Sequence, residues 1–276
     1  MSTLRIAVGF KVTPDYEALR PADWAQAEAR GVVEAPFVRR VLNVFDECAL
    51  ELALRLRDER AGLGLATELS AFSVAGREAE PHLRTLQALG YERAARVETG
   101  ADLDFAPCAT AALVAAGTEH LGADLLLLGC RSGPGDGGTV PHLVAARLAR
   151  PCLTEVTAIA VTRDDRLRVT FTVDRGPARA DVMPPCVLAV GNALVAMLRV
   201  PTLKERLAVR ERRPAVLSPD ELGVDLAAAL AREPAALAGL ETVDRSRAAV
   251  RVDGATPREK AQALYATELR ARLEPS

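Results

Sequence analysis

The chain has 276 residues, of which 49% are hydrophobic and 26% charged, and its 35 Lys and Arg residues nearly balance its 37 Asp and Glu residues. This globular composition provides ample material for a core, so it excludes an intrinsically disordered chain and a disulfide-stapled mini-fold. The net charge of −2 does not favour a nucleic-acid binder, and at ~150 residues per domain the length suits one large domain or two modest ones.

The first half of the chain alternates strand-like and helix-like segments. Apolar residues recur at helical spacing from Phe45 to Leu56, and four consecutive leucines at 125–128 are typical of a strand buried on both faces. This alternation predicts a parallel sheet with helices on both sides. In chain order we expect a strand over 4–10, a turn at 14–15 with a polar stretch to about residue 40, a helix over 43–62, a strand over 69–74, a helix over 78–89, a strand over 94–97, a helix over 107–121, a strand over 124–129 and a helix over about 140–149.

The pattern changes after Pro151. Alternating apolar and polar residues over 167–173 predict a half-exposed antiparallel strand near the sheet edge, following a hairpin turn at 164–165. Residues 186–190 indicate another buried strand, 191–217 show no clean period, and 219–276 contain one clear helix over 257–273. We therefore predict an α/β fold, a Rossmann-like three-layer sandwich with a mainly parallel sheet, that occupies residues 1–217 and is followed by a C-terminal extension over 218–276.

A glycine-rich loop follows the leucine strand, with five glycines between Gly129 and Thr139. In open α/β sheets ligands bind at the carboxyl ends of the strands, and the helix after such a loop offers free N–H groups to a phosphate. The loop matches neither G-x-G-x-x-G nor a Walker A sequence. We favour a ligand-binding loop over a flexible connection without function. No Ser, His and Asp set, paired carboxylates or clustered metal ligands stand out in the sequence.

Two further features have a simpler default interpretation. The residues from Asn43 to Glu47 suit a helix cap with acidic residues in the first turn. The basic segment over 204–213 suits a solvated face, with a phosphate-binding patch or a steering surface for an acidic partner as alternatives. The five cysteines form no C-x-x-C pair, so the sequence supports neither a zinc ribbon nor a redox dithiol.

Taken together, these segments resemble the β subunit of the electron transfer flavoproteins. The similarity covers most of the chain and keeps the order of the family's motifs, although Val44 stands where the family has proline. The matching segments are 10–16 (FKVTPDY, like V-K-x-V-P-D), 43–47 (NVFDE, like N-P-F-D-E) with 53–56 (ALRL), 88–90 (ALG, like A-M-G), 108–111 (CATA, like L-A-T-A), 122–140 (strand and glycine-rich loop), 184–187 (PPCV, like L-P-A-V), 201–203 (PTL) and 221–225 (ELGVD).

The resemblance implies a heterodimer in which an α subunit holds most of an FAD. The β chain would bind AMP, or in some family members a second FAD, and its extension would embrace the partner. The pair would carry electrons from flavin dehydrogenases to a quinone oxidoreductase or a similar acceptor. Tyr16 matches the position that approaches the flavin of the α subunit, and Leu203, Arg206 and Arg210 match the region that docks partners. The implied cofactor-binding residues are Gly9, Lys11, Tyr16, Asn43, Val44, Phe45, Asp46, Val74, Ala75, Gly129, Arg131, Gly135, Asp136, Gly137, Gly138, Thr139 and Val140.

Two other classes of protein stay open. A stand-alone adenine-nucleotide-binding protein of the universal-stress type would not need residues 204–276, and a nucleotide hydrolase or synthetase would need an S-G-G-x-D-S motif that we do not find. No targeting signal opens the chain, and no apolar run approaches the ~20 residues that span a bilayer. We therefore expect a cytoplasmic protein that serves as an electron carrier subunit without catalytic groups of its own.

Overall fold

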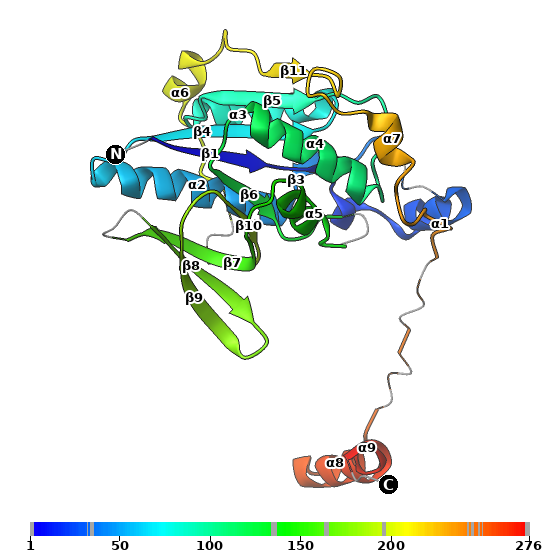
Figure 1. Cartoon of the computed structure of the whole chain (residues 1–276). Helices are drawn as coiled ribbons and strands as arrows, with labels where there is room; N and C mark the ends of the chain where they lie inside the picture. The colour runs from blue at the N-terminus through cyan, green and yellow to red at the C-terminus, as the bar shows by residue number, and fades with distance from the viewer. Residues whose placement is uncertain are drawn as a thin grey trace. The chain divides into compact units, whose positions relative to one another are not determined.

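The computed structural model describes residues 3–31, 33, 36–133, 137–162, 166–194, 197–241, 243, 246–247, 249 and 251–273 (Figure 1). The chain divides into two compact units, Met1–Leu240 and Glu241–Ser276. The first unit holds the sheet, and it includes residues 218–240, the first part of the expected extension. No helix among the described residues has the length and apolar composition needed to cross a membrane.

The core of the first unit is a mainly parallel sheet, as the sequence predicts. Among the described residues it has nine strands in the order β11-β5-β4-β1-β6-β10-β7-β8-β9, and only the pairs β7–β8 and β8–β9 are antiparallel. The strands are β1 (Leu4–Gly9), β4 (Thr67–Val74), β5 (Arg93–Val97), β6 (Leu125–Gly129), β7 (Cys152–Val161), β8 (Leu167–Val173), β9 (Gly176–Val182), β10 (Cys186–Val190) and β11 (Ala215–Leu217), with β2 (Val12–Pro14) and β3 (Arg40–Leu42) as a separate antiparallel pair.

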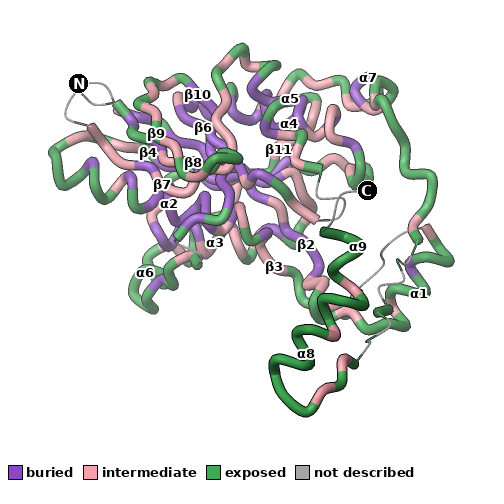
Figure 2. The backbone as a smooth tube through the Cα atoms, turned by 90° about the horizontal axis from the view of Figure 1, so that it is seen from below, coloured by how far each residue is buried: buried purple, intermediate pink, exposed green. Residues whose placement is uncertain are grey.

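Helices cover both faces of the sheet and complete a Rossmann-like arrangement of layers (Figure 1). One face, which includes Ile6 and Leu127, packs against α2 and α3, and the other, which includes Ala7 and Leu126, packs against α4 and α5. Figure 2 shows buried residues along the central strands. The helices of this unit are α1 (Pro21–Arg30), α2 (Val44–Gly62), α3 (Glu80–Ala88), α4 (Pro107–His120), α5 (Val140–Arg147), α6 (Leu203–Ala208) and α7 (Leu226–Leu230), with the 3₁₀ turns η1 (Tyr16–Ala18) and η2 (Arg77–Ala79).

Some elements lie in segments without a clear hydrophobic period. Helix α1 occupies the polar stretch expected before residue 40, and because it buries only Ala27 it has no apolar stripe to reveal it. Strand β11 has three residues and depends on its pairing with β5. Strand β9 alternates half-buried and exposed positions at the edge of the sheet. The turn predicted at 164–165 lies outside the described residues.

The second unit contains the helix predicted over 257–273. It consists of α8 (Pro257–Leu264), a π-helical turn η3 (Tyr265–Leu269) and α9 (Arg270–Leu273), and none of these residues is buried. Tyr265, Leu269 and Leu273 are exposed and four residues apart. Since residues at this spacing share one side of a helix, they form an apolar stripe.

The strand order creates a topological switch point in the middle of the sheet. β4 lies on one side of β1 and β6 on the other, so the order of the strands reverses there. In the parallel register Val8 lies beside Ala71 and Leu127, which brings the carboxyl ends of the three strands to one edge. Ligands of open α/β sheets bind in the crevice at such a point.

A buried carboxylate on α2 anchors the segment that leads to α6. The side chain of Glu51 is 5% exposed and accepts hydrogen bonds from Arg199 Nη2 at 2.8 Å and from Arg55 Nε at 3.2 Å. Arg199 also donates to Asp58 at 2.7 Å. Burial acts to raise the pKa of Glu51, but the hydrogen bonds from Arg199 and Arg55 outweigh it and hold the pKa below its usual value.

Replacing Arg199 with methionine is expected to lower the free energy of unfolding at pH 7 by about 2 kcal/mol, because a buried carboxylate loses its main partner while Arg199 itself is partly solvated. A carboxyl with a depressed pKa stabilises the fold above its unfolded pKa, and this contribution is lost as the pH falls. The difference in unfolding free energy between Arg199→Met and the wild type should therefore become smaller when the pH falls below about 4.5, which is the ordinary pKa of glutamate. Urea unfolding of both proteins at pH 7 and at pH 4 measures this difference. Arg168→Met, which breaks an exposed pair with Asp181, is the control, and an Arg199→Met effect independent of pH would contradict the assignment.

Candidate functional site

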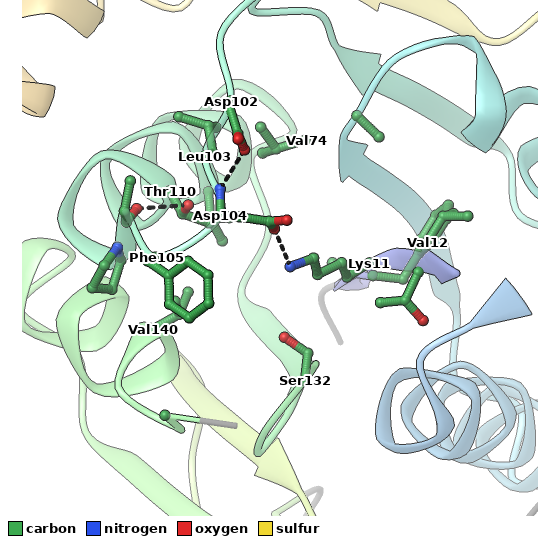
Figure 3. Close-up of a pocket in the computed structure, with 18 of the residues that line it drawn as sticks. Lys11, Val12, Val74, Asp102, Leu103, Asp104, Phe105, Thr110, Ser132 and Val140 are labelled. Carbon is green, nitrogen blue, oxygen red and sulfur yellow. Dashed lines mark hydrogen bonds and ion pairs between the residues drawn. The ribbon is translucent and has the colours of Figure 1, made fainter. Parts of the chain in front are cut away.

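A cavity of about 780 Å³ opens at the carboxyl ends of the central strands (Figure 3). Its floor includes Gly9 of β1, Val74 of β4 and Gly129 of β6, and its walls include the loop over 98–107, the start of α5 and residues 235–238. Small-molecule sites have volumes of about 300–1,000 Å³. The cavity therefore has a size that suits a nucleotide.

A buried aspartate at the start of α2 ties together the two strands at the switch point. Asp46 Oδ2 accepts hydrogen bonds from Lys11 N at 2.9 Å and from Asn43 Nδ2 at 3.1 Å, and Oδ1 accepts one from Gly129 N at 2.6 Å. Burial raises the pKa of Asp46 to about 6, against the lowering effect of these hydrogen bonds. Asp46 and Asn43 form a clamp that fixes where the chain leaves β1 and β6, which we call the Asp46 clamp.

The same helix start also positions Arg131, which lines the cavity. Asn43 Nδ2 donates to the carbonyl oxygen of Arg131 at 2.8 Å, and the guanidinium carbon of Arg131 lies 5.7 Å from the centre of the Phe45 ring. Arg131 Nη2 is 3.7 Å from Glu155 Oε1 on β7. A guanidinium over an aromatic face is favourable. Asn43 and Phe45, which do not line the cavity themselves, therefore position the Arg131 guanidinium at the cavity wall.

Two glycines allow the close approach of chains at the floor. A Cβ at Gly9 would lie 2.6 Å from Leu128 Cδ2, and a Cβ at Gly129 would lie 2.5 Å from Asp46 Oδ1 and 2.9 Å from Phe45 Cβ. Real Cβ atoms do not approach other atoms so closely. At Gly129 the obstruction is the Asp46 clamp itself, so a side chain there is incompatible with it.

Helix α5 begins at one end of the cavity. The first turn of a helix leaves N–H groups without partners inside the helix, and the helix dipole adds partial positive charge. Thr139 precedes α5 without a side-chain capping bond, Pro141 has no N–H group, and Leu143 N bonds to Thr139 O. The N–H groups of Val140 and His142 remain as first-turn donors. Gly138, Thr139 and Val140 line the cavity together with Arg131, which suits a phosphate group.

Acidic side chains lie on the wall formed by the loop between β5 and α4. Glu98, Asp102 and Asp104 all line the cavity. Lys11 Nζ, from the end of β1, donates to Asp104 Oδ1 at 3.0 Å and so connects the floor with this wall. The cavity is therefore lined both by the start of α5 with Arg131 and by acidic side chains.

Tyr16 lies at the cavity and is supported by a second aromatic residue. It belongs to η1 after the β2 strand, and its ring stacks on Trp24 of α1, with 6.1 Å between ring centres and 25° between the ring planes. Burial raises the pKa of Tyr16 to about 12. The hydroxyl therefore stays protonated at neutral pH and serves as a hydrogen-bond donor rather than a base.

The chain after α7 returns to complete the cavity wall. Glu233 Oε1 accepts a hydrogen bond from Ala109 N at 2.7 Å, in the first turn of α4. Ala229 packs against Ala106, Ala109 and Ala112. Residues 235–238, which line the cavity, follow directly. Glu233 therefore already occupies the positive end of α4.

The acids and thiols that the structure describes form no cluster suited to a metal ion. Within this part of the chain no three His, Cys, Asp or Glu residues are placed to hold a metal ion, and all five cysteines are free thiols. Cys130 lines the cavity, where burial raises its pKa to about 11, so it is not a thiolate at neutral pH.

Most of the chain matches a known protein family. Residues 32–222 match the electron transfer flavoprotein domain. The chain belongs to the electron transfer flavoprotein family. The match covers the Asp46 clamp, β6 and the glycine-rich loop, and the acidic wall, which together make most of the cavity.

The relatives of this electron transfer flavoprotein chain include β subunits. It is 31% identical to YgcR of Escherichia coli (strain K12), a proposed electron transfer flavoprotein subunit, over 99% of this chain and 100% of that protein. It is 28% identical to the electron transfer flavoprotein subunit beta of Homo sapiens over 83% of this chain and 87% of that one, and 26% identical to that of Dictyostelium discoideum over 81% and 84%. The chain is thus a divergent β-like member of the family.

Most of the predicted cofactor-binding residues line the cavity of this electron transfer flavoprotein chain. Three of the predicted residues, Asn43, Val44 and Phe45, do not line the cavity. Asn43 and Phe45 instead contact Arg131, which does. Gly135 and Asp136 lie outside the described residues. Those in the lining are Gly9, Lys11, Tyr16, Asp46, Val74, Ala75, Gly129, Arg131, Gly137, Gly138, Thr139 and Val140.

Sequence reasoning missed two walls of the cavity. The loop over 98–107 carries Gly100 and two aspartates between a strand and a helix, and its place at the carboxyl end of a parallel strand was a usable signal. Residues 235–238 carry no such signal in the sequence. Their place at the cavity follows from the contact of Glu233 with α4, which joins residues 124 positions apart.

The predicted partner-docking residues lie away from the cavity lining. Leu203 begins α6 and is 73% exposed, and Thr202 caps that helix by accepting from Glu205 N. Arg206 lies in the same helix, and Arg210 follows it and pairs with Glu211 at 3.0 Å. Their role in docking remains a prediction.

Proposed function

We propose that this chain is the β subunit of an electron transfer flavoprotein and that its cavity binds AMP as a structural ligand. With an α subunit it forms a heterodimer that carries FAD. The observation that carries the AMP proposal is the cavity at the switch point, because it combines nucleotide size with an anion-binding end. The family match and the β-subunit relatives support the assignment of the subunit.

The residues of the cavity fit a nucleoside monophosphate. The N–H group of Val140 and the guanidinium of Arg131 would hold the phosphate. The apolar ends of β1 and β4, with Val74 and Ala75, would face the base. The Asp46 clamp would keep the floor in place. The alternative occupant is a second FAD, whose additional ring system would have to extend past the phosphate end.

The FAD shared with the α subunit supplies the redox chemistry when it is bound. This chain would contribute orientation and exclusion of water. Tyr16, fixed by Trp24, would lie beside the flavin, and the apolar stripe on the helix over 257–273 would bind the α subunit. Leu203, Arg206 and Arg210 would dock flavin dehydrogenases and a quinone oxidoreductase or similar acceptor.

Gly138→Glu is expected to remove bound nucleotide. The position has φ of +62°, and a Cβ would lie 3.2 Å from Cys130 O, so the new side chain would be strained and would place negative charge beside the phosphate. Mass spectrometry of the purified full-length chain with its partner measures AMP per chain. Gly176→Glu is the control, because Gly176 also has positive φ but its Cβ would meet no atom within 4 Å. Unchanged AMP in Gly138→Glu would contradict this placement of the phosphate.

A further inference from the structure

Basic and acidic groups line different parts of the cavity. The anion-binding side consists of the start of α5 and Arg131, whereas the wall between β5 and α4 carries Glu98, Asp102 and Asp104. Carboxylates repel a phosphate but accept hydrogen bonds from hydroxyl groups. A nucleotide with its phosphate at α5 would therefore present its sugar hydroxyls to the acidic wall.

Among the described residues, five carboxylates line the cavity, and four of them already bind other groups of the protein. Asp46 accepts three hydrogen bonds in the clamp. Glu78 accepts from Gly76 N at 2.9 Å, and Asp102 accepts from Asp104 N at 2.9 Å. Glu98 lies 3.0 Å from Nη1 of the buried Arg96.

Asp104 is held differently. Its Oδ1 accepts from Lys11 Nζ at 3.0 Å, and both side chains are partly exposed, at 44% and 37%. Figure 3 shows this pair crossing the cavity, with Val74 on one side and Ser132, Phe105 and Val140 on the other. The pair thus lies between the end that would receive a base and the end that would receive a phosphate, which is the place of the sugar.

We propose that Asp104 recognises the 2′,3′-diol of the sugar and makes the cavity selective for ribonucleotides over deoxyribonucleotides. This inference rests on the proposed nucleotide site and adds its specificity. Asp104 keeps a carboxylate oxygen beyond the one that binds Lys11, and Lys11 holds the carboxylate in the cavity. A hydrogen bond to a charged group is worth about 1.5–3 kcal/mol, which corresponds to roughly ten- to hundredfold in affinity.

The test compares three nucleotides on the full-length chain with its partner subunit, after removal of bound nucleotide. Dissociation constants of AMP, 2′-deoxy-AMP and 3′-deoxy-AMP are measured by calorimetric competition. The wild type should bind AMP at least about tenfold more tightly than one of the deoxy compounds. Asp104→Ala should bring that ratio close to one, whereas Asp104→Asn, which keeps an acceptor oxygen, should keep part of it. The ratio is the readout because freeing Lys11 changes the affinity for every phosphate-bearing ligand.

Asp181→Ala serves as the matched control, because it removes a paired carboxylate of similar exposure from the β8–β9 hairpin. It should keep the wild-type ratio. Equal affinity of the wild type for all three nucleotides would overturn the proposal while the nucleotide site stands. Persistence of the ratio in Asp104→Ala would overturn it as well. If the wild type binds none of the three, the proposed AMP site itself fails, and this inference fails with it.

Discussion

Replacing Asp46 with asparagine is expected to lower the free energy of unfolding by about 3 kcal/mol and to abolish nucleotide binding. The two oxygens of Asp46 accept hydrogen bonds from Lys11 N, which follows β1, and from Gly129 N at the end of β6. An amide offers one oxygen, so its NH₂ group would face either Lys11 N or Gly129 N, and a buried donor would lose its partner. Urea unfolding and AMP content together measure the effect.

Asp124→Asn is the matched control at the opposite end of the same strand pair. Asp124 precedes β6 and accepts hydrogen bonds from Arg5 N and Arg5 Nη2, at 3.0 and 3.1 Å, but its side chain is 33% exposed. Water can replace these bonds, so the loss should be at most about 1 kcal/mol and AMP should stay bound. Equal effects of the two substitutions would contradict the clamp.

Gly129→Ala is expected to destabilise the protein by about 2–3 kcal/mol, an amount typical of overpacking in a rigid site. The added methyl group would lie 2.5 Å from Asp46 Oδ1 and 3.0 Å from Asn43 Nδ2. Both atoms belong to the Asp46 clamp, so they cannot move without breaking hydrogen bonds. Thermal or urea unfolding measures the change, and AMP content should fall with it.

Gly62→Ala controls for the general effect of replacing a glycine. Gly62 is the last residue of α2, and a Cβ there would meet no atom within 4 Å. Alanine favours the helix, so the variant should be as stable as the wild type or slightly more stable. If Gly129→Ala unfolds at the same urea concentration as Gly62→Ala, the close packing of Gly129 against the Asp46 clamp does not contribute to stability, and the prediction is wrong.

The sequence predicted the sheet, its flanking helices and the glycine-rich loop because their periodicity is local. It also drew attention to Asn43–Glu47, but not to what these residues do. The default interpretation was a helix cap, yet Asn43 makes no side-chain capping bond and donates to Asp46 and Arg131. Arg131 is 88 residues away in the chain, and spacing along the sequence carries no information on such a contact.

The walls of the cavity show the same limit. Asp104 and Lys11 pair across 93 residues, and Glu233 reaches α4 across 124. Tyr16 was expected beside the flavin of a partner, but its support by Trp24 depends on helix α1, which has no apolar stripe to predict it. Local patterns therefore specify the layers, whereas the site depends on loops that tertiary contacts bring together.

The visible absorption spectrum of the complex purified through this chain tests the central claim most directly. The chain is co-expressed with an electron transfer flavoprotein α subunit from the same organism, and the complex is isolated by a tag on this chain. We expect a heterodimer with flavin absorbance that reduction bleaches, and little flavin on this chain alone. A stable complex without flavin absorbance would contradict the assignment to an electron transfer flavoprotein heterodimer.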